Sequence, residues 1–166
     1  MTEIIVDVAY DAWNTKLPGA EERCCLVAAV ALGAAAATVD LPAPRLEVSI
    51  LLTDDTQIQE LNREYRQQDK PTNVLSFAAL DEDSPIPPDG PILLGDVIVA
   101  YQTTEREARD EGKSFADHLS HLVVHGVLHL LGYDHIEDGE AEEMESLERS
   151  ILAALGVPDP YKDAPA

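Results

Sequence analysis

The feature that most constrains the fold is an apolar helix that carries four histidines on one side. Residues 114–132, SFADHLSHLVVHGVLHLLG, place Leu or Val on nearly every side of a helix, and such a helix must be buried over most of its surface. The histidines stand at 118, 121, 125 and 129, within about 80° of one another on the helix. The sequence therefore predicts a buried helix with one polar stripe, around which the other elements pack.

Length and composition fit a globular protein with one core. Of the 166 residues, 45% are hydrophobic and 26% charged, which is ordinary for globular proteins. We expect a single domain over residues 1–166, with 158–166 as a flexible tail. The adjacent Cys24 and Cys25 cannot supply a framework of disulfides, so the reducing cytoplasm is expected. The longest apolar stretch, 24–37, is shorter than the about 20 residues of a membrane span, so no membrane location is expected.

Strand-like and helix-like segments alternate along the chain. The segments predicted as strands are 3–10, 45–53, 73–80 and 92–100. The segments predicted as helices are 18–37, 54–68, 102–111, 114–131 and 139–155. The proline-rich segment 81–91 is predicted to be a loop at the rim of a cleft. The expected fold is α+β, with a small four-stranded mixed sheet packed with about five helices.

The segment HGVLHLLGYDH, residues 125–135, has the spacing of a metal site. His125 and His129 lie one helical turn apart, so both rings can reach one ion at about 2.0–2.1 Å. Gly132 can end the helix, and the chain can then fold back to offer His135. The pattern predicts one zinc ion (Zn²⁺) on these three histidines, a zincin-like site at the end of a buried helix. Its fourth position stays open to water, as in catalytic zinc sites.

Other interpretations of the histidines remain open. Two histidines one turn apart on a buried helix can instead be a hydrogen-bonded pair of the core. His118 and His121, earlier on the same stripe, are expected either to orient the ligands or to bind no metal.

Gly126 bears on the chemistry that this site can perform. It stands where zinc peptidases of the pattern H-E-x-x-H-x-x-G-x-x-H carry their general base, which speaks against a peptidase. A glycine inside a helix costs about 1 kcal/mol relative to alanine, so we expect another backbone or a ligand to approach it closely. Zinc lowers the pKa of a bound water to about 7, which provides a nucleophile without a carboxylate. A phosphodiester substrate fits, because its attack requires mostly charge neutralisation.

The chain is strongly acidic, with a formal net charge of −21. Such a surface repels phosphate backbones at long range, and no DNA partner is expected. Residues 134–148 contain eight carboxylates and no Lys or Arg, which we interpret as a solvated helix face. In 62–71, by contrast, Arg63, Arg66 and Lys70 outnumber the acidic residues.

Three segments resemble the YbeY family of bacterial ribosomal-RNA maturation factors. They are HGVLHLLGYDH (125–135), YRQQDKPTNVLSF (65–77) and LLGDVIVA (93–100), and they occur in order over most of the chain. The second departs from the family in Asn73, where many members have Asp, and in Ala78, where many have Pro. Neither is a predicted ligand.

The resemblance implies a zinc-dependent single-strand endoribonuclease. It would act in the maturation of the 16S ribosomal RNA 3′ end and in ribosome quality control, with the ribosomal RNA precursor, the small subunit and assembly factors as partners. The resemblance also implies zinc at His125, His129 and His135, and a catalytic role for Arg66.

The residues themselves leave several points open. A guanidinium can stabilise the negative charge that builds on phosphate oxygens during attack, but Arg66 alone would equally fit a surface ion pair. Asp134 can serve as a base or can orient an imidazole. Attack by water and attack by the 2′-hydroxyl both fit. Two alternative functions remain: a ribosome assembly factor with a structural metal and little catalysis, and a zinc peptidase-like hydrolase.

Overall fold

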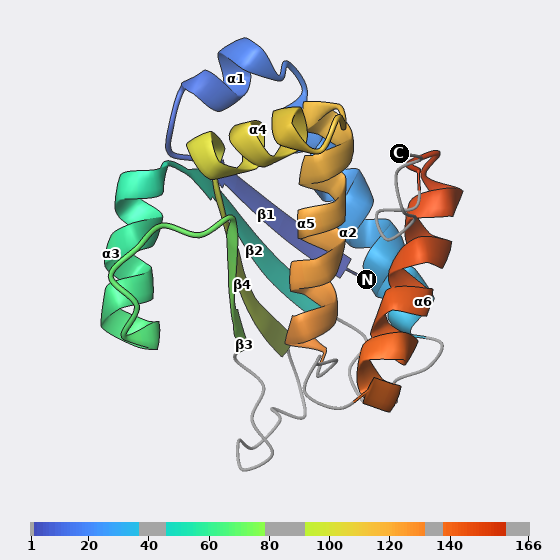
Figure 1. Ribbon diagram of the computed structural model, residues 1–166. Coiled ribbons are helices and arrows are strands. Elements are labelled where there is room, and N and C mark those ends of the chain that lie inside the picture. The colour runs from blue at the N-terminus through green and yellow to red at the C-terminus, as the bar shows by residue number, and fades with distance from the viewer. Residues whose placement is uncertain (1, 37–45, 79–91, 132–137, 159–166) are drawn as a thin grey trace.

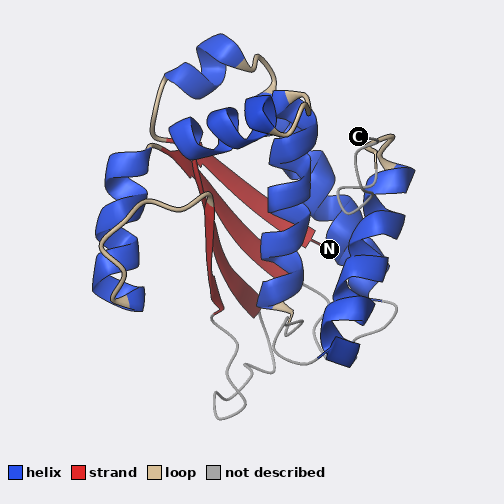
Figure 2. Ribbon diagram, viewed as in Figure 1, coloured by secondary structure: helices blue, strands red, loops and turns tan. Residues whose placement is uncertain are grey.

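A four-stranded mixed sheet forms the centre of the protein (Figures 1 and 2). The computed structural model describes residues 2–36, 46–78, 92–131 and 138–158. The strands are β1 (Thr2–Val8), β2 (Leu46–Thr53), β3 (Val74–Ala78) and β4 (Ile92–Ala100). Their order is β1-β2-β4-β3; β1, β2 and β4 are parallel, and β3 is antiparallel to β4. The predicted mixed sheet is confirmed, and β3 forms one of its edges.

Six helices lie within the described residues. They are α1 (Ala12–Lys16), α2 (Ala20–Ala36), α3 (Asp55–Arg66), α4 (Tyr101–Asp110), α5 (Phe115–Leu130) and α6 (Asp138–Ala154). All but α1 were predicted, with bounds that agree to within two residues. The α+β class is therefore confirmed, and the prediction of about five helices was one helix short.

The additional helix α1 exists because of one tryptophan. Trp13 is fully buried, and its indole Nε1 donates a hydrogen bond to the carbonyl oxygen of Thr53 at 2.9 Å. Its ring packs against Tyr101 and Phe115 at centroid distances of 5.4 and 5.3 Å. A helix of five residues is too short for a hydrophobic period to show in the sequence. Packing of Trp13 into the core, not local propensity, therefore defines α1.

The helices cover both faces of the sheet. On one face, α2 and α5 pack on the strands, and α6 lies beside them (Figure 1). Val48, Ile50 and Leu52 of β2 are buried in this layer, as apolar residues at every second position of a strand predict. On the other face, Ile58 of α3 packs with Ile98 and other residues of β3 and β4. Because α5 packs against the sheet, α2, α4 and α6, it is buried over most of its surface, as its composition predicts.

Two glycines permit close contacts around β3 and α5. Gly95 of β4 has φ 143°, and a Cβ there would lie 2.2 Å from the carbonyl oxygen of Phe77. A Cβ on Gly126 would lie 2.7 Å from Val97 Cγ1 and 3.3 Å from Ser76 Oγ. The close approach expected at Gly126 is thus present, but the neighbours are side chains of the sheet instead of a backbone or a ligand.

Some expectations fall on parts of the chain that are not described. The predicted loop 81–91 and the tail from residue 159 onward lie outside the described residues. Among the helices that are described, none combines the length and the apolarity required to cross a membrane.

Candidate functional site

The four histidines of α5 form the predicted stripe. The helix begins after Ser114, whose Oγ accepts a hydrogen bond from the backbone N–H of Asp117 at 3.0 Å, a typical N-cap. Along the stripe, the ring centroids of His118 and His121 are 6.2 Å apart, and the next pair, His121 and His125, is also 6.2 Å apart. His125 and His129 are closer, with centroids 4.5 Å apart. The closest two histidine rings of the stripe therefore lie at its C-terminal end.

In this close pair the two Nε2 atoms face each other. Nε2 of His125 and Nε2 of His129 are 3.0 Å apart. Ligand atoms about 2.0–2.1 Å from one zinc ion lie roughly 2.9–3.4 Å apart for bond angles of about 90–110°. The separation of the two nitrogens is therefore compatible with a shared ion.

Behind His125 lies a carboxylate that the sequence did not lead us to expect. Glu148 of α6 is fully buried, and its Oε1 lies 2.6 Å from Nδ1 of His125. A carboxylate oxygen can only accept, so Nδ1 donates, and Nε2 of the neutral ring then carries a lone pair. That lone pair lies on the side of the ring that faces His129.

Glu148 also contacts a second histidine. Its Oε2 lies 3.5 Å from Nε2 of His121, and His121, His125 and Glu148 together form a group that could hold a metal ion. The 2.6 Å contact between Glu148 and His125 is shorter than the spacing of two ligands on one zinc ion, and it is typical of a charge-assisted hydrogen bond. We therefore interpret Glu148 as a partner of the histidines and place the ion-binding side at Nε2 of His125 and His129.

Glu148 corrects our interpretation of the acidic run. Residues 134–148 were interpreted as a solvated helix face, yet Glu148 is fully buried. The signal lay in the spacing: Met144, Glu148 and Ile151 recur at intervals of four and three residues, and all three are buried. A carboxylate inside an apolar stripe indicates a buried polar partner, and here the partners are His121 and His125.

A pocket of about 550 Å³ opens beside the histidine pair. Its walls come from three elements: Arg66 at the end of α3, residues of the edge strand β3, and His125 and His129 of α5. Asn73, just before β3, also lines it. The predicted catalytic arginine and two of the three predicted ligands, which are about 60 residues apart in the chain, thus share one pocket.

Arg66 is held in a defined position on β3. Its Nη2 donates to the carbonyl oxygen of Ser76 at 2.7 Å, and its Cζ lies 5.2 Å from the centroid of the Phe77 ring. Within the described part of the chain, no carboxylate lies within ion-pair distance of Arg66. The surface ion pair that the sequence allowed is therefore not formed there, and the charge of Arg66 can act on an anion in the pocket.

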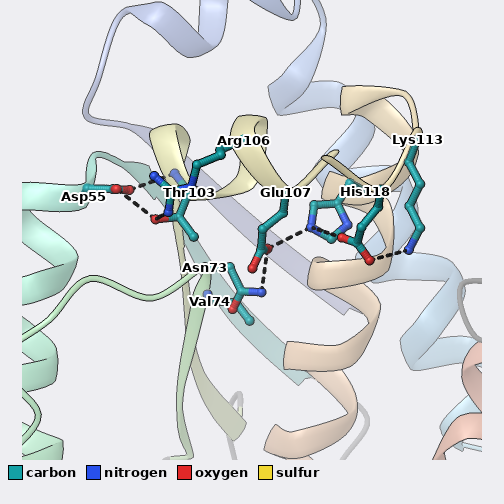
Figure 3. Close-up of polar contacts among 9 residues, drawn as sticks. Asp55, Asn73, Val74, Thr103, Arg106, Glu107, Lys113 and His118 are labelled. Atoms are coloured by element: carbon teal, nitrogen blue, oxygen red, sulfur yellow. Dashed lines mark hydrogen bonds and ion pairs between the residues drawn. The ribbon is translucent and has the colours of Figure 1, made fainter. Parts of the chain in front are cut away.

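His118 belongs to a different network, which Figure 3 shows. Its Nε2 lies 3.0 Å from Oε1 of Glu107, and the same oxygen accepts a hydrogen bond from Nδ2 of Asn73 at 2.9 Å. The amide of Asn73 thus links the wall of the pocket to α4 and α5. Many YbeY members have a carboxylate at position 73. An amide fits here because its N–H group donates a hydrogen bond to the carboxylate of Glu107.

The third predicted ligand cannot be placed. His135, together with Gly132 and Asp134, lies outside the described residues. Its coordination of zinc and the role of Asp134 therefore remain predictions.

Comparison with known proteins identifies the family of the chain. The family model described as Endoribonuclease YbeY matches residues 14–156. A protein named Endoribonuclease YbeY from Paramagnetospirillum magneticum is 60% identical over 160 residues, which cover 96% of this chain and 95% of that protein. Its namesake from Rhodospirillum rubrum is 56% identical over 164 residues, covering 97% and 82% of the two chains.

A solved structure shows the same fold. The solution structure of a Thermotoga maritima protein aligns with a TM-score of 0.51 at 24% identity and covers 98% of this chain and 100% of its own. At that identity the likeness concerns the fold alone, whereas the family match and the close relatives extend over nearly the whole chain. The chain therefore belongs to the Endoribonuclease YbeY family.

Proposed function

We propose that this protein is a zinc-dependent endoribonuclease that cleaves single-stranded RNA in the maturation of the 16S ribosomal RNA 3′ end and in ribosome quality control. The observation that carries the proposal is the pair of Nε2 atoms of His125 and His129, 3.0 Å apart, in one pocket with Arg66. Membership of the family supports RNA cleavage as the reaction. The pocket brings together two imidazoles that could bind a metal ion and a guanidinium that could bind a phosphodiester.

The donor set fits zinc. His125, His129 and, as predicted, His135 would hold one ion through imidazole nitrogens, which are common zinc ligands. Bound there, zinc would polarise the scissile phosphate and activate an oxygen nucleophile at neutral pH. Glu148 already holds His125 with its Nε2 lone pair turned toward His129.

Arg66 would bind the scissile phosphate in the same pocket. The hydrogen bond to Ser76 and the contact with the Phe77 ring hold its guanidinium at the pocket. Attack at phosphorus builds negative charge on the non-bridging oxygens, and a guanidinium fixed in place stabilises that charge without a further rearrangement. Arg66 is therefore the residue that we assign to transition-state stabilisation.

The surface next to Arg66 in the chain suits an unpaired strand of RNA. The Tyr65 side chain is 62% exposed although it is a large aromatic, and its ring meets Phe77 edge-on at a centroid distance of 5.4 Å. Exposed aromatic rings next to cationic residues are stacking platforms for single-stranded bases. Arg63 and Lys70, both exposed, can contact flanking phosphates without selecting a sequence.

The net charge of −21 bears on the partners. A strongly acidic surface opposes the approach of free RNA, so we propose that affinity for the ribosomal RNA precursor comes largely from the small subunit and its assembly factors. We propose that the protein acts in the cytoplasm as a single domain.

A peptidase fits the structure less well. Position 126 faces Val97 and Ser76 so closely that even a Cβ would collide. A glutamate base could therefore not be placed there without a shift of the Val97 and Ser76 side chains. This leaves the assembly factor with a structural metal as the main competing proposal.

The test is cleavage of a single-stranded ribosomal precursor RNA by the full-length protein, after removal of metal with a chelator and after restoration with one equivalent of zinc. We expect cleavage to stop and to return, with a duplex of the same sequence cut far more slowly. Cleavage that is equal with and without zinc would contradict the proposal. Strong binding of the zinc-loaded protein to the small subunit with little or no cleavage would favour the assembly factor.

A further inference from the structure

We propose that Glu148 is the positioning residue of the metal site: it holds His125 in the tautomer that binds zinc and ties helix α6 to that site. The inference rests on the proposed zinc site and adds to it a residue that belongs to neither the predicted ligands nor the pocket wall.

The first support is the burial of Glu148. Its side chain is 0% exposed, and a carboxylate removed from water is costly unless hydrogen bonds satisfy it. Both oxygens meet imidazoles: Oε1 lies 2.6 Å from Nδ1 of His125, and Oε2 lies 3.5 Å from Nε2 of His121. An apolar side chain would fill the same core position without the free-energy cost of burying a charge. The function of the Glu148 carboxylate is therefore its bonding to the histidines.

The second support is the proton on His125. A neutral imidazole carries its proton on one nitrogen and a lone pair on the other. The bond to Glu148 keeps the proton on Nδ1, which leaves the lone pair on Nε2, 3.0 Å from Nε2 of His129. Ligating histidines commonly donate their second N–H to a carboxylate, which fixes the ring and raises its basicity as a ligand.

The third support is the place of Glu148 in the chain. It lies on α6, and the segment between α5 and α6 contains His135. The Glu148–His125 bond therefore joins the two helices that border the third predicted ligand. Binding of zinc and packing of α6 on α5 should stabilise each other.

The test compares Glu148→Gln with Glu143→Gln, an exposed position on the same helix. Glutamine keeps the size of the side chain, but its amide N–H can donate to Nδ1 and so drive the ring proton to Nε2. Zinc affinity of the full chain is measured at pH 7 by competition with a chromophoric chelator, with no RNA present. We expect Glu148→Gln to bind zinc about 10–100-fold more weakly and Glu143→Gln to bind as the wild type does. Equal affinity for all three proteins would overturn the inference.

A second measurement needs no substitution. Nitrogen-15 NMR of the histidine rings in the metal-free wild type reports which nitrogen of His125 is protonated. We expect Nδ1–H, and a ring protonated on Nε2 alone would overturn the inference. Neither measurement uses RNA cleavage, so zinc binding without cleavage would contradict the proposed function while leaving the role of Glu148 intact.

Discussion

Arg66, the last residue of α3, donates a hydrogen bond of 2.7 Å from its guanidinium to the backbone carbonyl of Ser76 on the edge strand β3. This bond joins the arginine to the strand that lines the pocket of His125 and His129. It fixes the position of the positive charge before any substrate binds, which is the condition for efficient electrostatic stabilisation of a transition state.

Replacing Arg66 should therefore reduce catalysis without unfolding the protein. We expect Arg66→Ala to lower the rate of RNA cleavage about 100- to 1,000-fold. Arg66→Lys should restore little, because an ammonium cannot form two parallel bonds to phosphate. Arg109→Ala on α4 is the control, since Arg109 forms a surface ion pair with Glu105 at 3.5 Å and has no role in the pocket. A rate for Arg66→Ala close to that of Arg109→Ala would exclude Arg66 from the reaction.

Tyr65 should contribute to binding of unpaired RNA. Because its side chain is 62% exposed, Tyr65→Ala should leave thermal stability nearly unchanged. We expect it to weaken binding of a single-stranded oligonucleotide by about 1–3 kcal/mol, the usual contribution of one base stacked on an aromatic ring, and Tyr65→Phe to retain most of the affinity. Fluorescence anisotropy with a labelled oligonucleotide measures both. Equal affinities for the alanine and phenylalanine variants would mean that no base stacks there.

Two helical glycines should respond to alanine in opposite directions. Gly126→Ala would place a Cβ 2.7 Å from Val97 Cγ1, so overpacking should reduce the free energy of unfolding by about 1–3 kcal/mol. Gly33→Ala on α2 meets nothing within 4 Å and should raise it by up to about 1 kcal/mol. Urea unfolding of the two variants gives the comparison. A stabilised Gly126→Ala protein would show that the α5–sheet contact is not tight.

The buried thiol of Cys24 should make stability depend on alkaline pH. Burial raises its pKa from 9.0 to about 12. Between these values the unfolded chain releases the thiol proton and the folded chain keeps it, so stability is unaffected below about pH 9 and falls by about 1.4 kcal/mol per pH unit above it. Urea unfolding under reducing conditions should show a loss of about 1 kcal/mol between pH 9 and pH 10 in the wild type, because the thiol of the unfolded chain is already half ionised at pH 9. In Cys24→Ala the other alkaline groups titrate as before, so its free energy of unfolding should fall by that much less than the free energy of the wild type. Equal losses in the two proteins would mean that the pKa of Cys24 is not raised by folding.

Most of the architecture could be predicted from the sequence, because its elements show clear periods. The apolar face of Val48, Ile50 and Leu52 and the all-round apolar α5 follow directly from residue spacing. Helix α1 could not be predicted, since it depends on tertiary packing of Trp13 against residues distant in the chain.

The site was predicted in part. Spacing alone brings His125 and His129 together, because a helical turn has fixed geometry. The role of Arg66 required the family likeness, since no local pattern indicates that the last residue of α3 lines the same pocket as His125 and His129. Glu148 was missed because seven further carboxylates in 134–148 made the run look like a solvated face. The apolar residues Met144 and Ile151 on the same side of α6 indicate correctly that Glu148 is buried.

The most direct test of the histidine site is the rate at which His129→Ala cleaves a single-stranded ribosomal precursor RNA in the presence of zinc. His118→Gln is the matched control, since His118 lies on the same stripe but bonds to Glu107. We predict that His129→Ala loses cleavage almost entirely while His118→Gln, if folded as the wild type by circular dichroism, retains it. Undiminished cleavage by His129→Ala would contradict a hydrolytic metal site at this end of α5.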